Sequence, residues 1–382
     1  MLASPRKVLS LIHGWLGAIS AIFIILIAGS GVMLAFVGEL FLAQHGNAIQ
    51  TTEPAVSSQS ANVAELLQAS NAYKDDFQTM GILMPHSRIE EIETAMVFGM
   101  PSGADASDGI RILSIDPNNL EYKGDFALSR TFGHELLEFH HSLLLGNGGI
   151  IFVCILSILL IVFLITGLYL WWPKNNKIWR KATTLNLRHN LKQTCFSLHA
   201  WLGVWSSMLI LYFTITGLAL TKPEWFSPLL SPHIYTPPVS AGFDKKCDND
   251  ITPEDAEMTA RNAFPDKKFP NKQLATFFLP NEENGPYYLT YKLGNDNNQR
   301  DGDGRVFVHG SCVGLVHVET TETITLPLKI TRMLLTLHGG YTFGKTIGQI
   351  LVVLTGLSLM LLAGTGLVTF FTRTIGKRRV RI

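Results

Sequence analysis

The chain has 382 residues, of which 47% are apolar and 16% are charged, and its mean hydropathy is +0.23. Soluble domains carry about 25% charged residues, so this composition excludes an ordinary soluble enzyme and indicates a membrane protein. A formal net charge of +1 excludes a global attraction to nucleic acid, and four cysteines are too few for a disulfide-built scaffold.

Four apolar stretches are long enough to cross a bilayer, which takes about 20 residues. They cover roughly residues 9–37, 150–172, 200–220 and 347–371, and none of them contains Asp, Glu, Lys or Arg. The first stretch is longer than the apolar core of a signal peptide, which has about 7–15 residues. We therefore expect it to be a retained helix.

These stretches predict the domain organisation of a membrane α-helical protein. We expect four transmembrane helices, within residues 1–39, 131–172, 193–221 and 331–372, with an interfacial segment before the second and the fourth. Between them lie two outer domains, 40–130 and 222–330, and a connector, 173–192. A basic tail, 373–382, follows the last helix.

The charges between the spans predict the orientation, because basic loops stay on the cytoplasmic side of a membrane. The connector has six basic residues and no acidic one. By contrast, residues 40–133 contain five basic and twelve acidic residues, and residues 222–331 contain eleven and fifteen. Both termini and the connector are therefore expected in the cytoplasm, with the two long segments outside.

Both outer segments carry the signals of a small α+β domain. Residues 60–73 and 252–263 have helical patterning, and Thr252 can cap the second helix with Pro253 at its first position. Residues 110–115, 287–293 and 306–308 favour strands. Cys247 and Cys312 share the second segment, where an oxidising compartment would permit a disulfide, although the sequence does not fix their distance.

The chain also contains an internal repeat. The pattern His-x-Trp-Leu-Gly begins at His13 and recurs at His199. Each of these histidines is followed by a glycine at the same spacing along the chain, and His140 and His338 are each followed by a glycine at a shorter common spacing. The sequence therefore predicts two copies of one plan: helix, outer α+β domain, helix.

The repeat places the histidines at two heights. His13 and His199 begin outward-running helices and form the inner pair, whereas His140 and His338 precede inward-running helices and form the outer pair. The segment from each inner histidine to its glycine, as a helix, rises about 27 Å, nearly the thickness of the hydrocarbon layer. Four glycines should therefore lie level with the opposite pairs: Gly31 and Gly217 with the outer pair, Gly167 and Gly366 with the inner pair.

Paired imidazoles from different helices are the axial ligands of a six-coordinate b-type haem, so the pattern predicts two haems. We expect His13 and His199 to hold one haem iron and His140 and His338 the other. Glycines near the ligands would let helix backbone approach a macrocycle; they are Gly14, Gly17, Gly203, Gly31 and Gly217.

The outer pair leaves alternatives open. His134 and His141 lie close to His140 in the sequence and are alternative ligands for the outer haem. His140 is preferred because it keeps the register of the repeat.

These motifs resemble the PepSY-associated transmembrane family. The resemblance rests on the His-x-Trp motifs at His13 and His199, the Phe-His-x-Ser-Leu run around His140, Trp171-Trp172-Pro173 and Leu337-His338-Gly-Gly. The outer segments resemble PepSY modules, with Ile115-Asp116-Pro117 in the first. The second departs from the family pattern, because Val308-His309-Gly310 stands where an Asp-Pro turn is typical.

The resemblance implies a ferric-siderophore reductase of the bacterial inner membrane, with both outer domains in the periplasm. Haems at two heights would carry electrons across the bilayer. The cytoplasmic segments are too short for a flavin or nicotinamide site, so a quinol or a separate protein is expected as donor. Two alternatives are a haem-free, membrane-anchored binding or regulatory module, and a proton-coupled solute transporter with histidines as proton relays.

Overall fold

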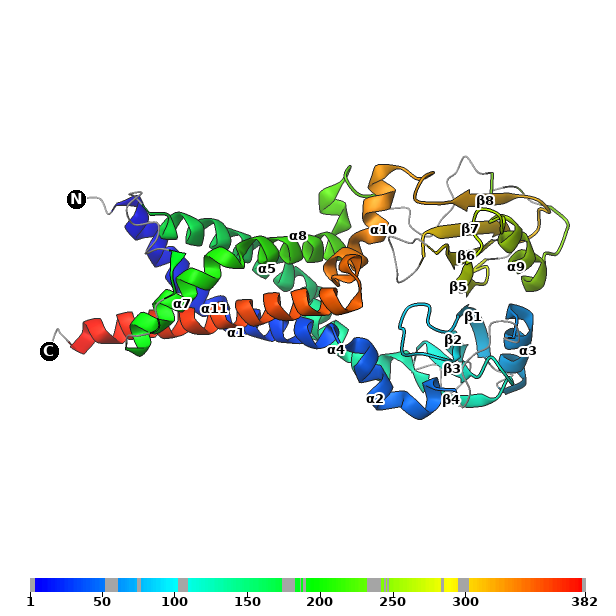
Figure 1. Ribbon diagram of the computed structural model, residues 1–382, viewed down its shortest axis with the longest axis horizontal. Helices are drawn as coiled ribbons and strands as arrows, with labels where there is room; N and C mark the ends of the chain where they lie inside the picture. Colours follow the sequence, from blue (N-terminus) through cyan, green and yellow to red (C-terminus); the bar gives the residue numbers. More distant parts are fainter. Residues whose placement is uncertain are drawn as a thin grey trace.

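The computed structural model describes residues 4–51, 61–73, 77–101, 109–173, 183–185, 187, 190–231, 242–243, 245, 247–282, 285–294 and 302–379. The molecule is elongated, with a bundle of long helices at one end and a β-sheet with its own helices at the other (Figure 1). The first helix begins, and the last one ends, at the end of the bundle far from the sheet (Figure 1). We call this end of the bundle the terminal end and the opposite one the sheet end.

Three helices of the bundle are long and apolar enough to cross a membrane. They are α1 (Pro5–Leu34), α5 (Gly146–Trp171) and the apolar part, Lys345–Arg373, of α11 (Lys345–Arg379). A fourth crossing is obtained if α7 (Leu191–Trp205) and α8 (Ser207–Thr221) count as one span. The chain is therefore a membrane protein with three or four helices of spanning length and composition among its described residues.

The expected third span is bent by 62° between α7 and α8. At the bend, the hydroxyls of Ser206 and Ser207 donate to the carbonyls of Leu202 and Val204 in the last turn of α7, at 2.6 and 2.8 Å. Such side-chain bonds compete with the backbone ladder and are a known cause of helix bending. The bend also lets α7 pack on α11 while α8 packs on α5.

Short helices connect the bundle to the sheet. Helix α2 (Val37–Ile49) follows α1 after two residues, and α4 (Phe132–Ser142) precedes α5. Helix α10 (Leu326–His338) precedes α11, and the short turns η2 (Leu128–Arg130), η4 (Pro223–Phe226) and η6 (Tyr341–Phe343) lie nearby. Helix α4 is separated from the second span by a break, since Leu143 and Leu144 have positive φ and α5 begins at Gly146.

The outer segments form one antiparallel sheet of eight strands in the order β4-β3-β2-β1-β5-β6-β7-β8. The first segment supplies β1 (Phe77–Leu83), β2 (Ala95–Pro101), β3 (Arg111–Ile115) and β4 (Tyr122–Ala127). The second supplies β5 (Gln273–Phe278), β6 (Pro286–Lys292), β7 (Gly304–His309) and β8 (Val316–Glu319). The expected α+β halves are thus joined through β1 and β5, which removes two exposed strand edges.

The two faces of the sheet are covered by different helices. Helices α3 (Val63–Tyr73) and α9 (Pro253–Asn262) cover one face and build the main hydrophobic core with both halves. The predicted cap of α9 is confirmed, because Thr252 and Asp255 form a reciprocal capping box with Pro253 in the first turn. On the other face, α2 packs on the first half and α10 contacts the second, where Arg332 pairs with Glu319.

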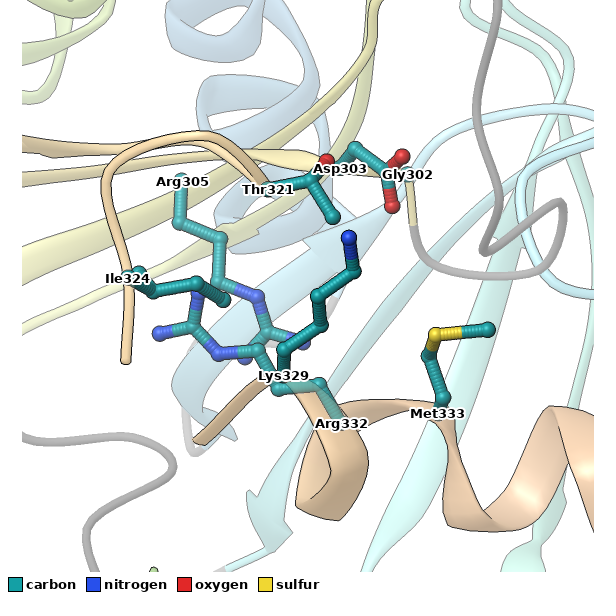
Figure 2. Close-up of a pocket in the computed structure, with 8 residues that line it drawn as sticks. All are labelled: Gly302, Asp303, Arg305, Thr321, Ile324, Lys329, Arg332 and Met333. Atoms are coloured by element: carbon teal, nitrogen blue, oxygen red, sulfur yellow. The ribbon is translucent and has the colours of Figure 1, made fainter. Parts of the chain in front are cut away.

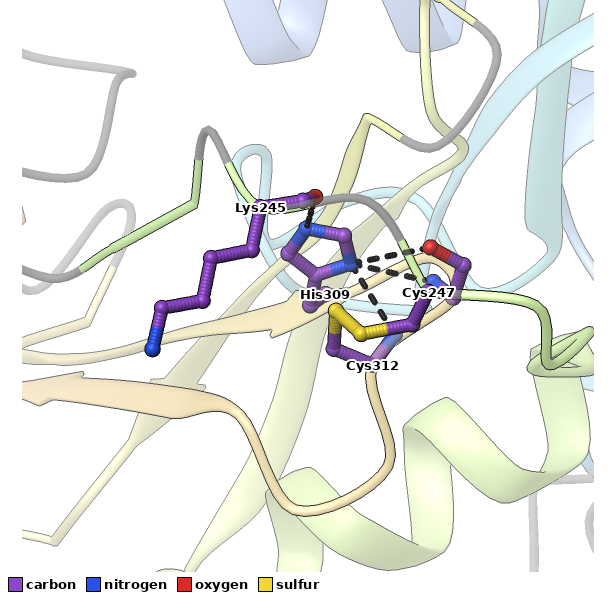
Figure 3. The surroundings of a disulfide bond; sticks show 5 residues. Lys245, Cys247, His309 and Cys312 are labelled. Atoms are coloured by element: carbon purple, nitrogen blue, oxygen red, sulfur yellow. Dashed lines mark hydrogen bonds between the residues drawn. A yellow bond between two sulfur atoms is a disulfide. The ribbon is translucent and has the colours of Figure 1, made fainter.

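In each half of the sheet, a buried side chain accepts hydrogen bonds from the backbone of the turn after the third strand, but the residue type differs. In the first half, the carboxylate of the buried Asp116 accepts from the backbone N–H of Asn118 at 2.9 Å. In the second half, Nδ1 of the buried His309 accepts from the backbone N–H groups of Ser311 and Cys312, at 3.0 and 3.1 Å (Figure 3). The departure from Asp-Pro therefore keeps an acceptor at the same place in the hairpin.

His309 also lies beside a disulfide bond. Cys247 and Cys312 are bonded, with their Cα atoms 5.1 Å apart (Figure 3). Nε2 of His309 donates to the carbonyl of Lys245 at 3.0 Å, so the ring joins the segment before Cys247 to the β7–β8 turn. The disulfide that the sequence permits but does not establish is therefore formed.

Candidate functional site

The inner pair comes together at the terminal end of the bundle. His13 lies on α1 and His199 on α7, and their ring centroids are 6.3 Å apart, with the ring planes nearly perpendicular at 89°. The ring of Phe163 contacts that of His13 edge-on, at 5.5 Å between centroids. The two histidines thus face each other from two different helices, as the repeat predicts.

The outer pair comes together at the sheet end. His140 lies near the end of α4 and His338 is the last residue of α10, and their ring centroids are also 6.3 Å apart, at 43°. His140 is therefore the α4 histidine whose ring meets the partner, as the repeat register predicts. His134 and His141 are half-buried on other faces of the same helix.

The spacing of the rings fits a single metal atom between them. A metal–imidazole bond is about 2.0 Å long, and a ring nitrogen lies about 1.1 Å from its own ring centre, so two rings on one metal have centres about 6 Å apart. Both pairs have this separation. Each pair therefore has the ring separation of two imidazoles that share one metal.

Backbone carbonyls fix the protonation of one ring in each pair. Nδ1 of His140 lies 2.9 Å from the carbonyl oxygen of Ile27, and Nδ1 of His199 lies 2.9 Å from that of Leu362. A carbonyl oxygen can only accept, so Nδ1 carries the proton in both rings. The lone pair then lies on Nε2, the nitrogen that a metal would need.

Hydroxyl groups fix the other two rings in the same way. Nδ1 of His13 lies 2.9 Å from the hydroxyl of Thr166, and Nδ1 of His338 lies 3.1 Å from that of Thr216. Both hydroxyls already donate to a carbonyl four residues earlier in their own helix, at 2.7 and 2.9 Å. Their oxygens therefore accept from the rings, and all four histidines take the tautomer with Nε2 available.

The same dipeptide meets each ring. A serine or threonine contacts Nδ1, and the glycine that follows it lies against the ring, where a Cβ would come within 2.7–3.4 Å of Cε1. The four dipeptides are Ser30-Gly31 for His140, Thr166-Gly167 for His13, Thr216-Gly217 for His338 and Thr365-Gly366 for His199.

These contacts add a role to those expected for the glycines. Gly31 and Gly217 lie level with the outer pair, as predicted, and they make room for the imidazole rings of His140 and His338. A Cβ at Gly17 would meet nothing within 4 Å, and one at Gly203 would meet only Leu362. The expected role of these two beside a haem stays a prediction.

The hydroxyl groups were missed from the sequence, although a signal for them was present. The repeat includes Thr166-Gly167-Leu168 and Thr365-Gly366-Leu367. Ser30 and Thr216 stand at the same place, directly before the glycines that end the spacing from the two inner histidines. In all four places a serine or threonine directly precedes the glycine, so its hydroxyl can accept a hydrogen bond from the histidine ring that lies against that glycine.

The outer pair is also connected to the sheet. The guanidinium of Arg332, on α10, pairs with the carboxylate of Glu319 on β8, and both side chains are 7% exposed. Beside it, Arg305 donates to the hydroxyl of Tyr288 at 2.7 Å. Burial, followed by the charge of Arg305, lowers the pKa of Arg332. Figure 2 shows the two guanidinium groups together between α10 and the sheet.

A second connection involves the first residue of α11. The ammonium group of Lys345 pairs with Glu91, in the segment between β1 and β2, and lies 3.4 Å from the carboxylate of Glu39 on α2. The helices around the outer pair are thus tied to both halves of the sheet.

Fold and site together define a membrane protein whose helix bundle presents two facing pairs of histidines near its opposite ends. Residues 10–373 match the model of the family described as the PepSY-associated TM region. The chain belongs to this family. No curated protein matches the chain.

Proposed function

We propose that the chain binds two b-type haems and carries electrons across the bacterial inner membrane to a ferric chelate in the periplasm. In this proposal the chain crosses the membrane four times as a two-fold repeat. Both termini are cytoplasmic, which places the inner pair near the cytoplasm and the outer pair near the periplasm.

One observation carries the proposal: two pairs of imidazoles, each with ring centroids 6.3 Å apart and each ring with its proton on Nδ1. In the described part of the chain, no third His, Cys, Asp or Glu joins either pair as a group able to hold a metal. Two protein ligands per metal leave the remaining positions to a planar, tetradentate macrocycle. Haem supplies four such nitrogens and, when bound, an iron that exchanges one electron.

The chain's own residues set the protonation and the packing of each ring. The hydroxyl and carbonyl acceptors hold the proton of each ring on Nδ1 and leave Nε2 unprotonated, so that no protonation change is needed for ligation. The glycines of the four dipeptides let the neighbouring helix close on the ring.

The donor and the acceptor follow from the position of the two pairs. A quinol in the bilayer, or a separate donor protein, would reach the inner pair. A ferric siderophore or a similar Fe³⁺ chelate would receive one electron beside the outer pair and become an Fe²⁺ chelate. Hard oxygen ligands hold Fe²⁺ less tightly than Fe³⁺, so the metal would be released.

Spectroscopy of the full-length protein tests the proposal. Purified in a mild detergent, the protein should show a Soret band that sharpens and shifts on addition of dithionite, with about two haems per chain. The prereduced protein should then be reoxidised by ferric siderophores in a single-turnover mixing experiment. A folded but colourless preparation would reject the proposal and favour the membrane-anchored module or the proton-coupled transporter.

A further inference from the structure

A cavity of about 340 Å³ lies in the first half of the sheet domain, and neither histidine pair contributes to its lining. Its walls come from α2, from strands β1 to β3 and the residue before β3, from the segment between β1 and β2, and from one residue each of η2 and β5. The residues that shape it most are Phe41, Met84, Met96, Phe98, Ile112 and Phe278. We call it the α2 cavity.

The α2 cavity is partly open to the outside and is much larger than the voids of packed cores. Protein interiors hold few voids larger than one water molecule, because atoms that line a void lose their dispersion contacts. The α2 cavity falls instead in the range of small-molecule sites, about 300–1,000 Å³. The surrounding cluster is otherwise well packed, with Phe41, Ile92, Met96 and Ile112 all at most 7% exposed.

The lining defines the chemistry of the occupant. Eleven of the thirteen lining residues are hydrophobic, and the two polar ones are neighbours, Ser87 and Arg88. Methionine side chains such as Met84 and Met96 adapt to flexible apolar ligands. The cavity therefore suits an alkyl chain with one anionic group, placed where the guanidinium of Arg88 can meet it.

The position of the cavity favours a ligand from the membrane. Helix α2, which carries Phe41, starts two residues after α1 ends. The segment that carries Arg88 is held at the sheet end of the bundle, since Glu91 pairs with Lys345 of α11. Met33 and Phe36, at the end of α1, are 43% and 38% exposed. Exposed apolar side chains therefore lie at the junction between a membrane helix and α2, the helix that lines the cavity.

The second half of the sheet offers a contrast on the same face. Between α10 and the sheet, the pocket lined by Arg305, Lys329 and Arg332 has a volume of about 10 Å³, no more than one water needs (Figure 2). Charged groups fill the space there. The space under α2 is apolar and open.

We propose that the α2 cavity binds one alkyl chain of an anionic amphiphile from the membrane, either a fatty acid or an anionic phospholipid. The chain lies among the Phe and Met side chains, and the carboxylate or phosphate lies at Arg88. This site is independent of the haem proposal, because neither its residues nor its ligand involve the histidine pairs.

Binding of hexadecanoate to the full-length, delipidated protein in a neutral detergent tests the site. We expect saturable binding of one molecule per chain. Met96→Trp should fill the cavity and weaken binding at least about tenfold, because the buried side chain of Met96 belongs to the cluster around the cavity. Met100→Trp is the matched control, because Met100 lies on β2 outside the cavity lining and is 39% exposed; it should bind as the unchanged protein does.

The head group is tested separately. Arg88→Gln should weaken hexadecanoate about tenfold and leave hexadecanol, which has no charge, unchanged. Mass spectrometry of lipids that copurify with the unchanged protein then separates the two sources: a fatty acid or phosphatidylglycerol supports the proposal, and neither compound on the protein contradicts it.

A photoreactive hexadecanoate on the unchanged protein avoids dependence on folding of the variants. Adducts within residues 83–98 or at 110–112 would support the proposal. Adducts confined to the membrane helices, absence of saturable binding, or equal binding by Met96→Trp and Met100→Trp would overturn it.

Discussion

The inner and outer histidine pairs have the same ring separation, but different parts of the molecule hold them. His13 and His199 lie on helices that belong to the membrane bundle. His140 and His338 lie instead on the short helices α4 and α10, between the bundle and the sheet. The inner pair therefore depends on packing within the bundle, whereas the outer pair also depends on how the sheet domain docks.

The packing around the rings differs in the same sense. A Cβ at Gly31 or Gly217 would lie 2.9 or 2.7 Å from the outer rings, whereas one at Gly167 or Gly366 would lie 3.4 or 3.3 Å from the inner rings. The outer rings are thus more tightly enclosed. The two histidine pairs therefore have the same ring separation but differ in how closely the surrounding helices enclose the rings.

Removal of a ligand should have the largest effect and separates the two sites. His199→Ala should reduce the haem content from about two to about one per chain and leave the outer haem, and His338→Ala should do the reverse. Haem per chain is measured by the pyridine haemochrome method, and the remaining low-spin signal by electron paramagnetic resonance. His134→Ala is the control and should keep both haems. Loss of both haems in either ligand variant would show that the sites are not separable.

Disruption of the buried ion pair between α10 and β8 should affect the outer site alone. Arg332→Met leaves the carboxylate of Glu319 buried without its guanidinium partner, which costs about 3–5 kcal/mol in other proteins. We expect a lower thermal midpoint of the sheet domain and faster loss of the outer haem on heating. Lys268→Gln breaks the exposed pair with Glu322 and should change neither. Equal loss of both haems in Arg332→Met would contradict the coupling between the outer site and the sheet.

Alanine at the ring-facing glycines tests the difference in enclosure. Gly217→Ala places a methyl group 2.7 Å from Cε1 of His338, and Gly366→Ala places one 3.3 Å from Cε1 of His199. Overpacking of this kind costs about 1–3 kcal/mol, so the outer site should lose haem and the inner site should adjust. Haem retention through gel filtration measures both. A larger loss in Gly366→Ala would reverse the comparison.

Removal of a hydroxyl acceptor should have a smaller effect, concentrated on one ring. Thr166→Val leaves Nδ1 of His13 without its described partner, whereas after Thr365→Val the ring of His199 keeps the carbonyl of Leu362. Loss of such an acceptor lowers metal affinity by about 10–100-fold. We therefore expect about tenfold faster transfer of the inner haem to apomyoglobin in Thr166→Val and little change in Thr365→Val. Similar rates in the two variants would show that the hydroxyls do not orient the rings.

The smallest expected effect is a pH dependence of the sheet domain. Burial raises the pKa of Glu257, whose carboxylate accepts from the backbone N–H of Val63 at 3.3 Å and joins α9 to α3. Because the folded state then binds the proton more tightly, stability should fall as the pH rises from the ordinary value of 4.5 through the higher folded pKa. Glu257→Gln should flatten the thermal midpoint over this window. An unchanged pH profile in Glu257→Gln would assign the dependence to another group.

Much of the site could be predicted from the sequence because the repeat fixes it. The equal spacing from His13 to Gly31 and from His199 to Gly217 requires only the rise of a helix to place each glycine level with the opposite pair. The register of the repeat also selects His140 over the other two histidines of α4. The pairing of each histidine with the correct partner followed from helix direction alone.

Other features depend on contacts between distant residues and could not be predicted. The two halves of the sheet are joined by three register pairs between β1 and β5, and these strands come from the two different outer segments of the chain. Helix α2 and its cavity depend on packing against strands that follow much later. The acceptor role of Ser30 or Thr166 becomes visible only when the ring of its partner is placed beside it.

The bend between α7 and α8 has a consequence for both ends of the molecule. One segment carries His199 toward α11 at the terminal end and presents Thr216 and Gly217 to His338 at the sheet end. Helix α1 makes the equivalent contacts, with His13 at one end and Ser30-Gly31 at the other, as one unbroken helix. A change in the bend angle at Ser206 would therefore move residues at both histidine pairs at once.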